Sequence, residues 1–210
     1  MRISVSADED TGVARSVLDE LRNRGHQTIE HGALAAGERA DWAWAAEATA
    51  RDVAGGRADA GIVCCWTGTG ASIAANKVPG VRAALCWDAP TAAGARTWND
   101  ANVLALSLRW TSRAVLTEIL DAWLGAEVST DAGDRANIEH LDRIAPADRP
   151  APPGHGPGRP AAPSARMSSA VVDPARWLRQ RGSGRDDPAA AGRERPATQG
   201  QRSPAWSTWC

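Results

Sequence analysis

The stretch DAGIVCCWTGTGASIAANK, residues 59–77, decides the fold because it joins a strand to a helix through a glycine turn. Residues 59–65 form a continuous apolar run, which is typical of a strand buried on both faces of a parallel sheet. Residues 72–77 favour a short helix. The intervening WTGTGAS has two glycines, Gly68 and Gly70, which let the backbone approach a ligand closely and expose N–H groups beside a helix start. On these grounds alone, however, the glycines could equally serve only to make the turn.

Strands and helices alternate on both sides of this stretch. Further strands are expected from short apolar runs at residues 2–7, 26–32, 81–87 and 102–108. Apolar spacing predicts helices after these runs, at residues 13–21, 41–56, 88–98 and 112–125, with a last helical piece at 134–144. Ser112 is the expected N-cap of one helix, and Asp8, Asp10 or Thr11 that of the first. The alternation predicts an α/β domain with a five-stranded parallel sheet and helices on both faces.

Composition excludes several classes of protein. The chain has 210 residues and a net charge of −1, so no overall basic field favours nucleic acid. No apolar run reaches the ~18 residues that a membrane span requires. The N-terminal MRISVSADED turns acidic where a secretory signal would be apolar, so we expect a cytoplasmic protein. The four cysteines contain no C-x-x-C pair and the four histidines are scattered, so no metal site is expected.

A change of composition divides the chain. Residues 1–145 carry the alternating pattern, and residues 146–210 are rich in Pro, Gly, Ala and Arg and have no sustained apolar period. Such a segment cannot bury enough apolar surface to offset chain entropy, so it is predicted to be disordered. We interpret it as a dispensable extension, and a weak basic interaction tail is the alternative.

The expected site lies at the carboxyl ends of the strands, where open parallel sheets bind ligands. Residues 6–10, 64–72 and 86–89 lie at such ends, and SLRW at 107–110 follows the last strand. The acidic run Asp8–Asp10 is compatible with a magnesium site. Helix capping with an acidic first turn is the preferred explanation of the run.

Cys65 adds chemistry to the glycine turn. A thiol that faces a helix N-terminus is more easily ionised and can act as base or nucleophile, although a lone cysteine is often a small apolar filler. Cys64 should point the opposite way, into the core. A thiolate beside backbone N–H groups can remove a proton next to a carbonyl while the amides hold the enediolate oxygen. This arrangement suits aldose–ketose isomerisation by proton transfer.

CWTGTGASIAANKVPGVRAALC at 65–86, followed by WNDANVLAL at 98–106, closely resembles the ribose-5-phosphate isomerase B and galactose-6-phosphate isomerase family. The resemblance spans roughly residues 1–125 and is weaker to 145. It implies a Rossmann-like, three-layer α/β/α fold. It also implies isomerisation of a small sugar phosphate without a cofactor, of the ribose 5-phosphate/ribulose 5-phosphate type of the pentose phosphate pathway. In this family the active site lies at a homodimer interface, so a homodimer or a dimer of dimers is expected.

The resemblance also implies roles for individual residues. Cys65 matches the proton-abstracting cysteine, and Asp8 matches a substrate-binding aspartate. Asn99 matches a polar site residue, and Arg109 matches an arginine that binds phosphate for the neighbouring subunit. The loop that binds substrate and stabilises the enediolate corresponds to Trp66, Thr67, Gly68, Thr69 and Gly70, with Thr67 counted as catalytic and with the Ser72 hydroxyl beside it.

The sequence departs from the family pattern at several of these positions. Glu9 stands where a histidine usually follows the aspartate, and Trp98 replaces the histidine assigned to opening of the sugar ring. Trp66 replaces the first glycine of the loop. Arg135 stands roughly where the first of two phosphate-binding arginines falls, and the second would fall near Asn137 or Ile138.

Three hypotheses follow. The first is an active sugar-phosphate isomerase with changed specificity, because loss of the ring-opening residue matters least for an open-chain substrate such as a four-carbon sugar phosphate. The second is a non-catalytic or regulatory dimer that binds sugar phosphate on the same fold. The third, a flavodoxin-like or response-regulator domain, explains the sheet and the acidic cluster but not the SIAANK run at 72–77.

Overall fold

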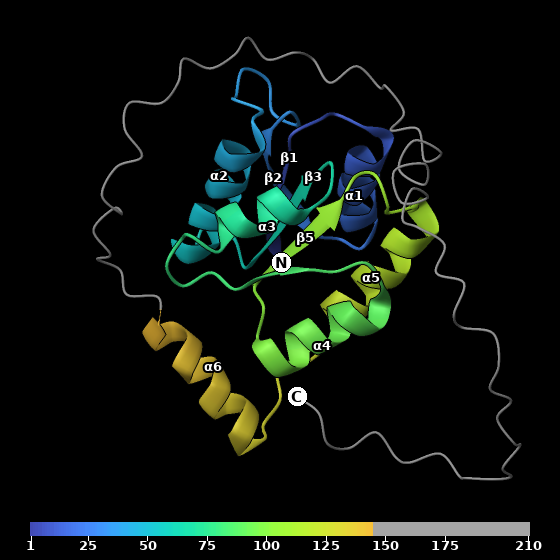
Figure 1. Cartoon of the computed structure of the whole chain (residues 1–210). Coiled ribbons are helices and arrows are strands. Elements are labelled where there is room, and N and C mark those ends of the chain that lie inside the picture. Colours follow the sequence, from blue (N-terminus) through green and yellow to red (C-terminus); the bar gives the residue numbers. More distant parts are fainter. Residues whose placement is uncertain (145–210) are drawn as a thin grey trace, which may run out of the picture. The chain divides into compact units, whose positions relative to one another are not determined.

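The computed structural model describes residues 1–144 and contains the predicted five-stranded parallel sheet (Figure 1). The strands are β1 (Arg2–Ala7), β2 (Gln27–Gly32), β3 (Ala60–Cys65), β4 (Ala83–Leu85) and β5 (Val103–Ser107). The helices are α1 (Gly12–Asn23), α2 (Trp42–Ala54), α3 (Thr69–Ala75), α4 (Ala89–Asn99), α5 (Arg113–Gly125) and α6 (Ala132–Ile144). The strand order is β2-β1-β3-β5-β4, with all pairs parallel. The predictions for residues 146–210 lie outside the described residues.

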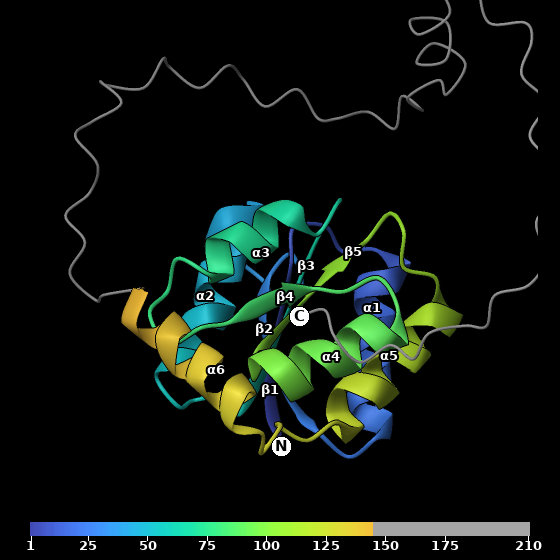
Figure 2. The same ribbon diagram turned by 60° about the horizontal axis from the view of Figure 1, so that its bottom comes forward.

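The helices form two layers, one on each side of the sheet. Helices α1, α4 and α5 pack on one face, and α2 and α3 pack on the other (Figures 1 and 2). Side chains of β3 alternate between these layers: Cys64 belongs to the core under α1, α4 and α5, and Cys65 to the core under α2 and α3. This confirms that β3 is buried on both faces and that Cys64 points away from Cys65 into the core.

Helix α5 shows how the sequence builds the larger core. The Ser112 hydroxyl accepts a hydrogen bond from the Val115 N–H at 3.3 Å, which confirms Ser112 as the N-cap. The fully buried side chains of α5 follow helical spacing, at Leu116, Ile119, Leu120 and Trp123. Burying each such aliphatic side chain contributes about 1.5–3 kcal/mol, so this stripe fixes the helix against the sheet.

The structure shows which of the candidate residues after β1 caps α1. The Thr11 hydroxyl accepts a hydrogen bond from the Ala14 N–H at 3.2 Å, so Thr11 is the N-cap. No acid lies in the first turn of α1, and the expectation of an acidic first turn is therefore wrong. Asp10 instead pairs with Arg15 at the surface, with 2.6 Å between Oδ1 and Nε.

Two elements differ in length from the sequence prediction. Helix α3 covers Thr69–Ala75 rather than the expected 72–77, because the chain turns into the helix directly after Gly68. Strand β4 covers only Ala83–Leu85 of the expected 81–87. It is an edge strand, and the Asn76 side chain both donates to the Ala83 carbonyl and accepts from the Ala83 N–H, at 2.8 Å each. A side chain thus occupies backbone groups that a further strand would otherwise use.

A buried ionic network joins β1, β2 and α2. The Asp52 side chain is 1% exposed and accepts hydrogen bonds from the Ser4 hydroxyl at 2.9 Å and from Arg57 Nε at 2.7 Å. His31 Nε2 lies 2.8 Å from the same carboxylate. Burial alone raises the pKa of Asp52, but the hydrogen bonds from His31, Arg57 and Ser4 outweigh it and hold the pKa below its ordinary value.

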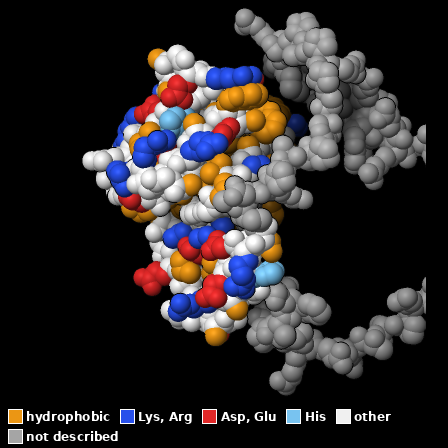
Figure 3. All heavy atoms as spheres, turned by 90° about the vertical axis from the view of Figure 1, so that its left-hand side faces the viewer, with side chains coloured by type: hydrophobic (Ala, Val, Ile, Leu, Met, Phe, Trp, Pro, Cys, Tyr) orange, Lys and Arg blue, Asp and Glu red, His pale blue; other side chains and the backbone are white. Residues whose placement is uncertain are grey.

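Helix α6 lies outside both layers. None of its residues is buried, and in Figure 3 it forms the lower lobe of the face shown. Within the described residues, it packs on α4, and Arg82 Nη1 lies 3.0 Å from Asp142 Oδ1. Within residues 1–144, no helix combines the length and apolar character needed to cross a bilayer.

Candidate active site

Most of the predicted site residues meet at one edge of the sheet. Because the strands are parallel, β1, β3 and β5 end side by side, and we call this the carboxyl edge. Asp8 and Glu9 follow β1 there, and Arg109 follows β5. The remaining members form the turn after β3 and the start of α3, namely Cys65, Trp66, Thr67, Gly68, Thr69, Gly70 and Ser72.

Gly68 lets the chain turn tightly from β3 into α3. It adopts the left-handed conformation, with φ of 78°, and a Cβ there would lie 2.5 Å from Cδ1 of Leu85 and 3.0 Å from the backbone of Leu106. The turn brings the N–H of Ala71 to 3.4 Å from Sγ of Cys65. Cys65 is only 4% exposed, so its sulfur lies under the turn with a backbone amide directed at it.

The outer side of this turn is polar on one flank and aromatic on the other. Thr67 and Thr69 are exposed, and their hydroxyl oxygens lie 2.7 Å apart. A Cβ at Gly70 would lie 3.0 Å from the ring of Trp42, so the first indole of α2 packs on the turn. Two hydroxyls beside exposed backbone can therefore bind a polar ligand, with Trp42 closing the other flank.

Asp8 carries an unsatisfied acceptor. Its Oδ1 is buried and has no hydrogen-bond partner among the described residues. The pKa of Asp8 is raised above its ordinary value. Burial is the largest cause and the charge of Glu9 adds to it, whereas the hydrogen bond from the backbone N–H of Trp66 lowers the pKa. Glu9 itself is exposed. A buried carboxyl oxygen without a partner, beside the end of β3, is suited to accept a hydroxyl from a ligand.

Trp66 and Arg109 tie the loops after β3 and β5 together. The carbonyl of Trp66 accepts hydrogen bonds from the Arg109 N–H at 3.1 Å and from the Ser107 hydroxyl at 2.9 Å. The Arg109 guanidinium also lies near the rings of Trp66 and Trp110. Arg109 thus places a positive charge beside the turn of its own copy, whereas the resemblance implies that it serves the neighbouring subunit.

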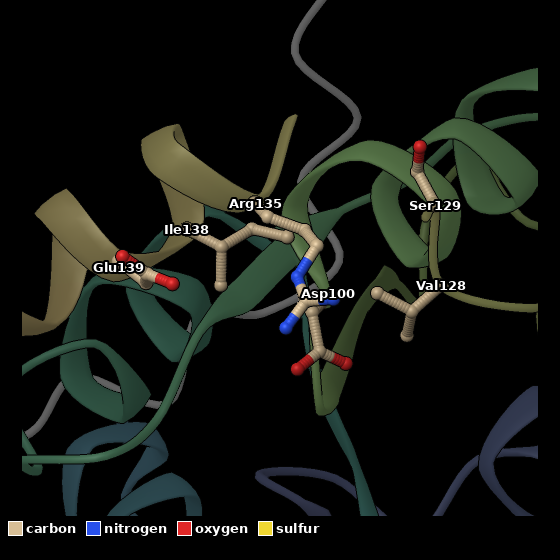
Figure 4. Close-up of a pocket in the computed structure, with 6 residues that line it drawn as sticks. All are labelled: Asp100, Val128, Ser129, Arg135, Ile138 and Glu139. Atoms are coloured by element: carbon tan, nitrogen blue, oxygen red, sulfur yellow. The ribbon is translucent and has the colours of Figure 1, made fainter. Parts of the chain in front are cut away.

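Three predicted residues lie at the opposite, amino edge of the sheet. Trp98 and Asn99 end α4, directly before β5 begins. Arg135 of α6 lines a pocket of about 460 Å³ with Asp100, Val128, Ser129, Ile138 and Glu139, and Figure 4 shows its side chain reaching toward Asp100. One copy of the chain therefore does not bring Trp98, Asn99 and Arg135 together with Cys65.

The structure also identifies residues that the sequence reasoning missed. Trp42, Ser107 and Trp110 all contact or support the turn after β3. The available signals were that Ser107 ends β5, that Trp110 follows it, and that Trp42 begins the helix after β2. Sequence reasoning also missed Glu139, which lies one helical turn after Arg135 and lines the same pocket.

Known proteins share this fold. Ribose-5-phosphate isomerase B of Escherichia coli (strain K12) is 42% identical over 111 residues, which cover 53% of this chain and 74% of that protein. D-erythrulose-4-phosphate isomerase of Pectobacterium atrosepticum is 34% identical over 142 residues, 67% of this chain and 93% of that protein. The structure of Clostridium thermocellum ribose-5-phosphate isomerase B matches with a TM-score of 0.63 at 36% identity, covering 69% of this chain and 97% of that one. The family model described as Ribose/Galactose Isomerase matches residues 3–141, and the chain belongs to this family.

Proposed function

We propose that this member of the family is an aldose–ketose isomerase of a small sugar phosphate, with Cys65 as its base. The observation that carries the proposal is the position of Cys65 Sγ, under a glycine turn at the carboxyl edge and 3.4 Å from the backbone N–H of Ala71. A base and several amide donors in one turn are what enolisation requires.

The reaction moves one proton between neighbouring carbons and a second proton between their oxygens, and it needs no cofactor. The Cys65 thiolate removes a proton from the carbon beside the carbonyl, and the electron pair of the broken C–H bond forms the enediolate. Backbone N–H groups of the turn and the Thr67 hydroxyl stabilise its oxygen. The thiol then returns a proton to the former carbonyl carbon, and the proton of the neighbouring hydroxyl passes to the former carbonyl oxygen, which exchanges aldose and ketose. Asp8 accepts a substrate hydroxyl on its unpartnered oxygen, and Arg109 binds the phosphate.

The substrate we favour is an open-chain four-carbon sugar phosphate. Trp98 cannot transfer a proton for ring opening. A tetrose 4-phosphate does not need that step, because its phosphate occupies the hydroxyl that would close a five-membered ring. The relative from Pectobacterium atrosepticum is named for erythrulose 4-phosphate, which supports this choice. Ribose 5-phosphate is the second candidate, and it would place the protein in the pentose phosphate pathway of the cytoplasm.

We further propose that the site is completed by a second copy of the chain. Trp98, Asn99 and Arg135 lie at the amino edge, away from Cys65. A two-fold homodimer, alone or within a dimer of dimers, would place the amino edge of one copy over the carboxyl edge of the other. Each site would then combine Cys65 of one copy with Arg135 of its partner.

The experiment follows solvent deuterium into the substrate by NMR. Erythrose 4-phosphate, ribose 5-phosphate and galactose 6-phosphate are incubated with the protein in deuterium oxide, and we expect exchange at the carbon beside the carbonyl, fastest for the tetrose. Trp98→His should raise exchange on ribose 5-phosphate more than on the tetrose. Absence of exchange into all three sugars, together with binding of any of them, would replace the enzyme by a sugar-phosphate-binding dimer.

A further inference from the structure

A cation and two indoles form a cluster at the carboxyl edge, which we call the Trp66–Arg109–Trp110 cluster. Cζ of Arg109 lies 5.9 Å from the ring centroid of Trp66 and 5.4 Å from that of Trp110. Both distances fall within the roughly 6 Å at which a ring face attracts a guanidinium. Trp66 follows β3 and Trp110 follows β5, so the indoles reach Arg109 from two loops.

The backbone fixes this cluster in place. Trp66 accepts hydrogen bonds at its carbonyl from the Arg109 N–H and from the Ser107 hydroxyl, at 3.1 and 2.9 Å. The same Ser107 oxygen accepts the N–H of Trp110 at 3.2 Å. All three members therefore share one hydrogen-bonded frame, and their side chains start from fixed positions.

The charge of Arg109 is left available for a ligand. Among residues 1–144, no carboxylate forms an ion pair with its guanidinium, whereas Arg82 and Arg96 both pair with Asp100. An indole face attracts a guanidinium without using up its N–H groups. Within residues 1–144, the five guanidinium donors of Arg109 are therefore left to bind an anion, for which the planar fork is well suited.

We propose that Trp66 and Trp110 are positioning residues that orient the Arg109 guanidinium toward the phosphate group of the substrate. The inference rests on the proposed function, since it presumes a phosphorylated ligand at this edge. The indoles replace the carboxylates that usually hold an arginine, so the guanidinium is restrained without being neutralised. Trp66 and Trp110 act through Arg109 and not on the reacting atoms.

The test measures binding without turnover. The full chain is titrated calorimetrically with erythritol 4-phosphate and ribitol 5-phosphate, which have no carbonyl and cannot be isomerised, and with the phosphate-free alditols. Trp66→Leu should raise the Kd of the phosphates by about 2- to 5-fold, and Trp66→Leu/Trp110→Leu should raise it further. Trp66→Phe retains a ring face and should restore most of the affinity. In the isomerase assay, Trp66→Leu should raise KM more than it lowers kcat.

Two comparisons separate positioning from other roles. Trp44→Leu removes an indole that is 51% exposed, packs on Arg39 and lies outside the cluster, and it should leave the Kd unchanged. Trp66→Leu should add little in an Arg109→Ala background, because the group it positions is already gone. Thermal unfolding of each variant verifies that the fold is retained.

Each contrary result has a distinct meaning. An unchanged phosphate Kd in Trp66→Leu, with wild type binding and turning over sugar phosphates, overturns the positioning role and leaves the isomerase proposal standing. Equal weakening of phosphates and free alditols, or full weakening in the Arg109→Ala background, assigns Trp66 a direct ligand contact and also overturns it. Wild-type protein that neither binds the phosphates nor exchanges deuterium overturns both proposals.

Discussion

Two adjacent cysteines occupy different chemical environments because a strand alternates its side chains. Cys64 lies in the core under α1, α4 and α5, where burial raises its pKa and the charge of Asp8 raises it further. A thiol in that setting stays protonated and serves only packing. Cys65 lies under the glycine turn, and its sulfur accepts the N–H of Ala71. Chemistry is therefore assigned to Cys65 alone.

Replacing each cysteine should separate these roles. Cys65→Ala should fold normally and lower the rate of deuterium exchange by ~10²–10⁴-fold, the usual contribution of a positioned base. Cys64→Ala, its matched control, should lower the free energy of unfolding by about 1 kcal/mol and preserve the exchange rate. Exchange that survives Cys65→Ala would show that another group is the base.

At the residue scale, sequence reasoning succeeds where local geometry decides. Strand alternation predicted the opposite directions of Cys64 and Cys65, and the glycine turn predicted an amide beside the sulfur. It placed Trp110 in the stretch 107–110 without giving it a role, and it missed Trp42, whose contact with Gly70 joins segments that are distant in the chain. No spacing rule reports which loops become neighbours once the sheet has formed.

At the element scale, Asp52 connects the end of α2 to β1 and β2 through Ser4 and His31. Its pKa is lower in the folded protein than in the unfolded chain, so folding favours the ionised carboxylate. The stabilisation is thus fully present above the unfolded pKa of about 4 and is lost as the pH falls through the lower, folded value.

We expect Asp52→Asn to lower the free energy of unfolding by about 3 kcal/mol at neutral pH, because it leaves His31 and Arg57 without their buried partner. The loss should shrink progressively below pH 4, as the pH falls toward the lowered pKa of the folded carboxylate. Asp41→Asn removes an exposed pair with Arg39 and should cost less than about 1 kcal/mol. Urea unfolding across pH 2.5–7, a range chosen around the ordinary carboxyl pKa, measures both; equal losses in the two variants would contradict this account.

The elements themselves were largely predictable, and their order was not. Apolar runs and helical spacing identified all five strands and the helices between them, because each must bury one stripe or face. The order β2-β1-β3-β5-β4 depends on which strand pairs with which, and periodicity does not encode that. Strand β4 was predicted too long because the apolar run at 81–87 continues beyond the three residues that pair with β5.

At the scale of the whole molecule, the core lies within residues 3–123 and the family match within 3–141. We therefore expect a chain truncated after residue 145 to fold, to remain dimeric and to keep its activity. Circular dichroism, light scattering and the deuterium assay measure the three properties. A monomeric truncated protein would assign residues 146–210 a role in assembly.

The separation of the two edges was beyond sequence reasoning, which placed Trp98, Asn99 and Arg135 in the site by resemblance alone. In the structure they lie at the amino edge, so a site that uses them with Cys65 must take them from another copy. This consequence can be tested without knowing the interface, because two defective copies can complement each other if each site draws on both.

Mixed dimers of Cys65→Ala and Asn99→Ala/Arg135→Ala should regain activity that neither variant has alone. In each mixed dimer, one site carries every substitution and the other carries none. Random pairing makes roughly half of the dimers mixed, and one of the two sites in each mixed dimer is intact. About a quarter of all sites are then intact, so the activity should approach roughly a quarter of the wild-type rate. Cys65→Ala mixed with Thr67→Ala is the control: both residues lie at the carboxyl edge of one copy, so every site keeps one defect and no activity should return. If the first mixture also stays inactive while light scattering shows mixed dimers, the amino edge does not contribute to the partner's site.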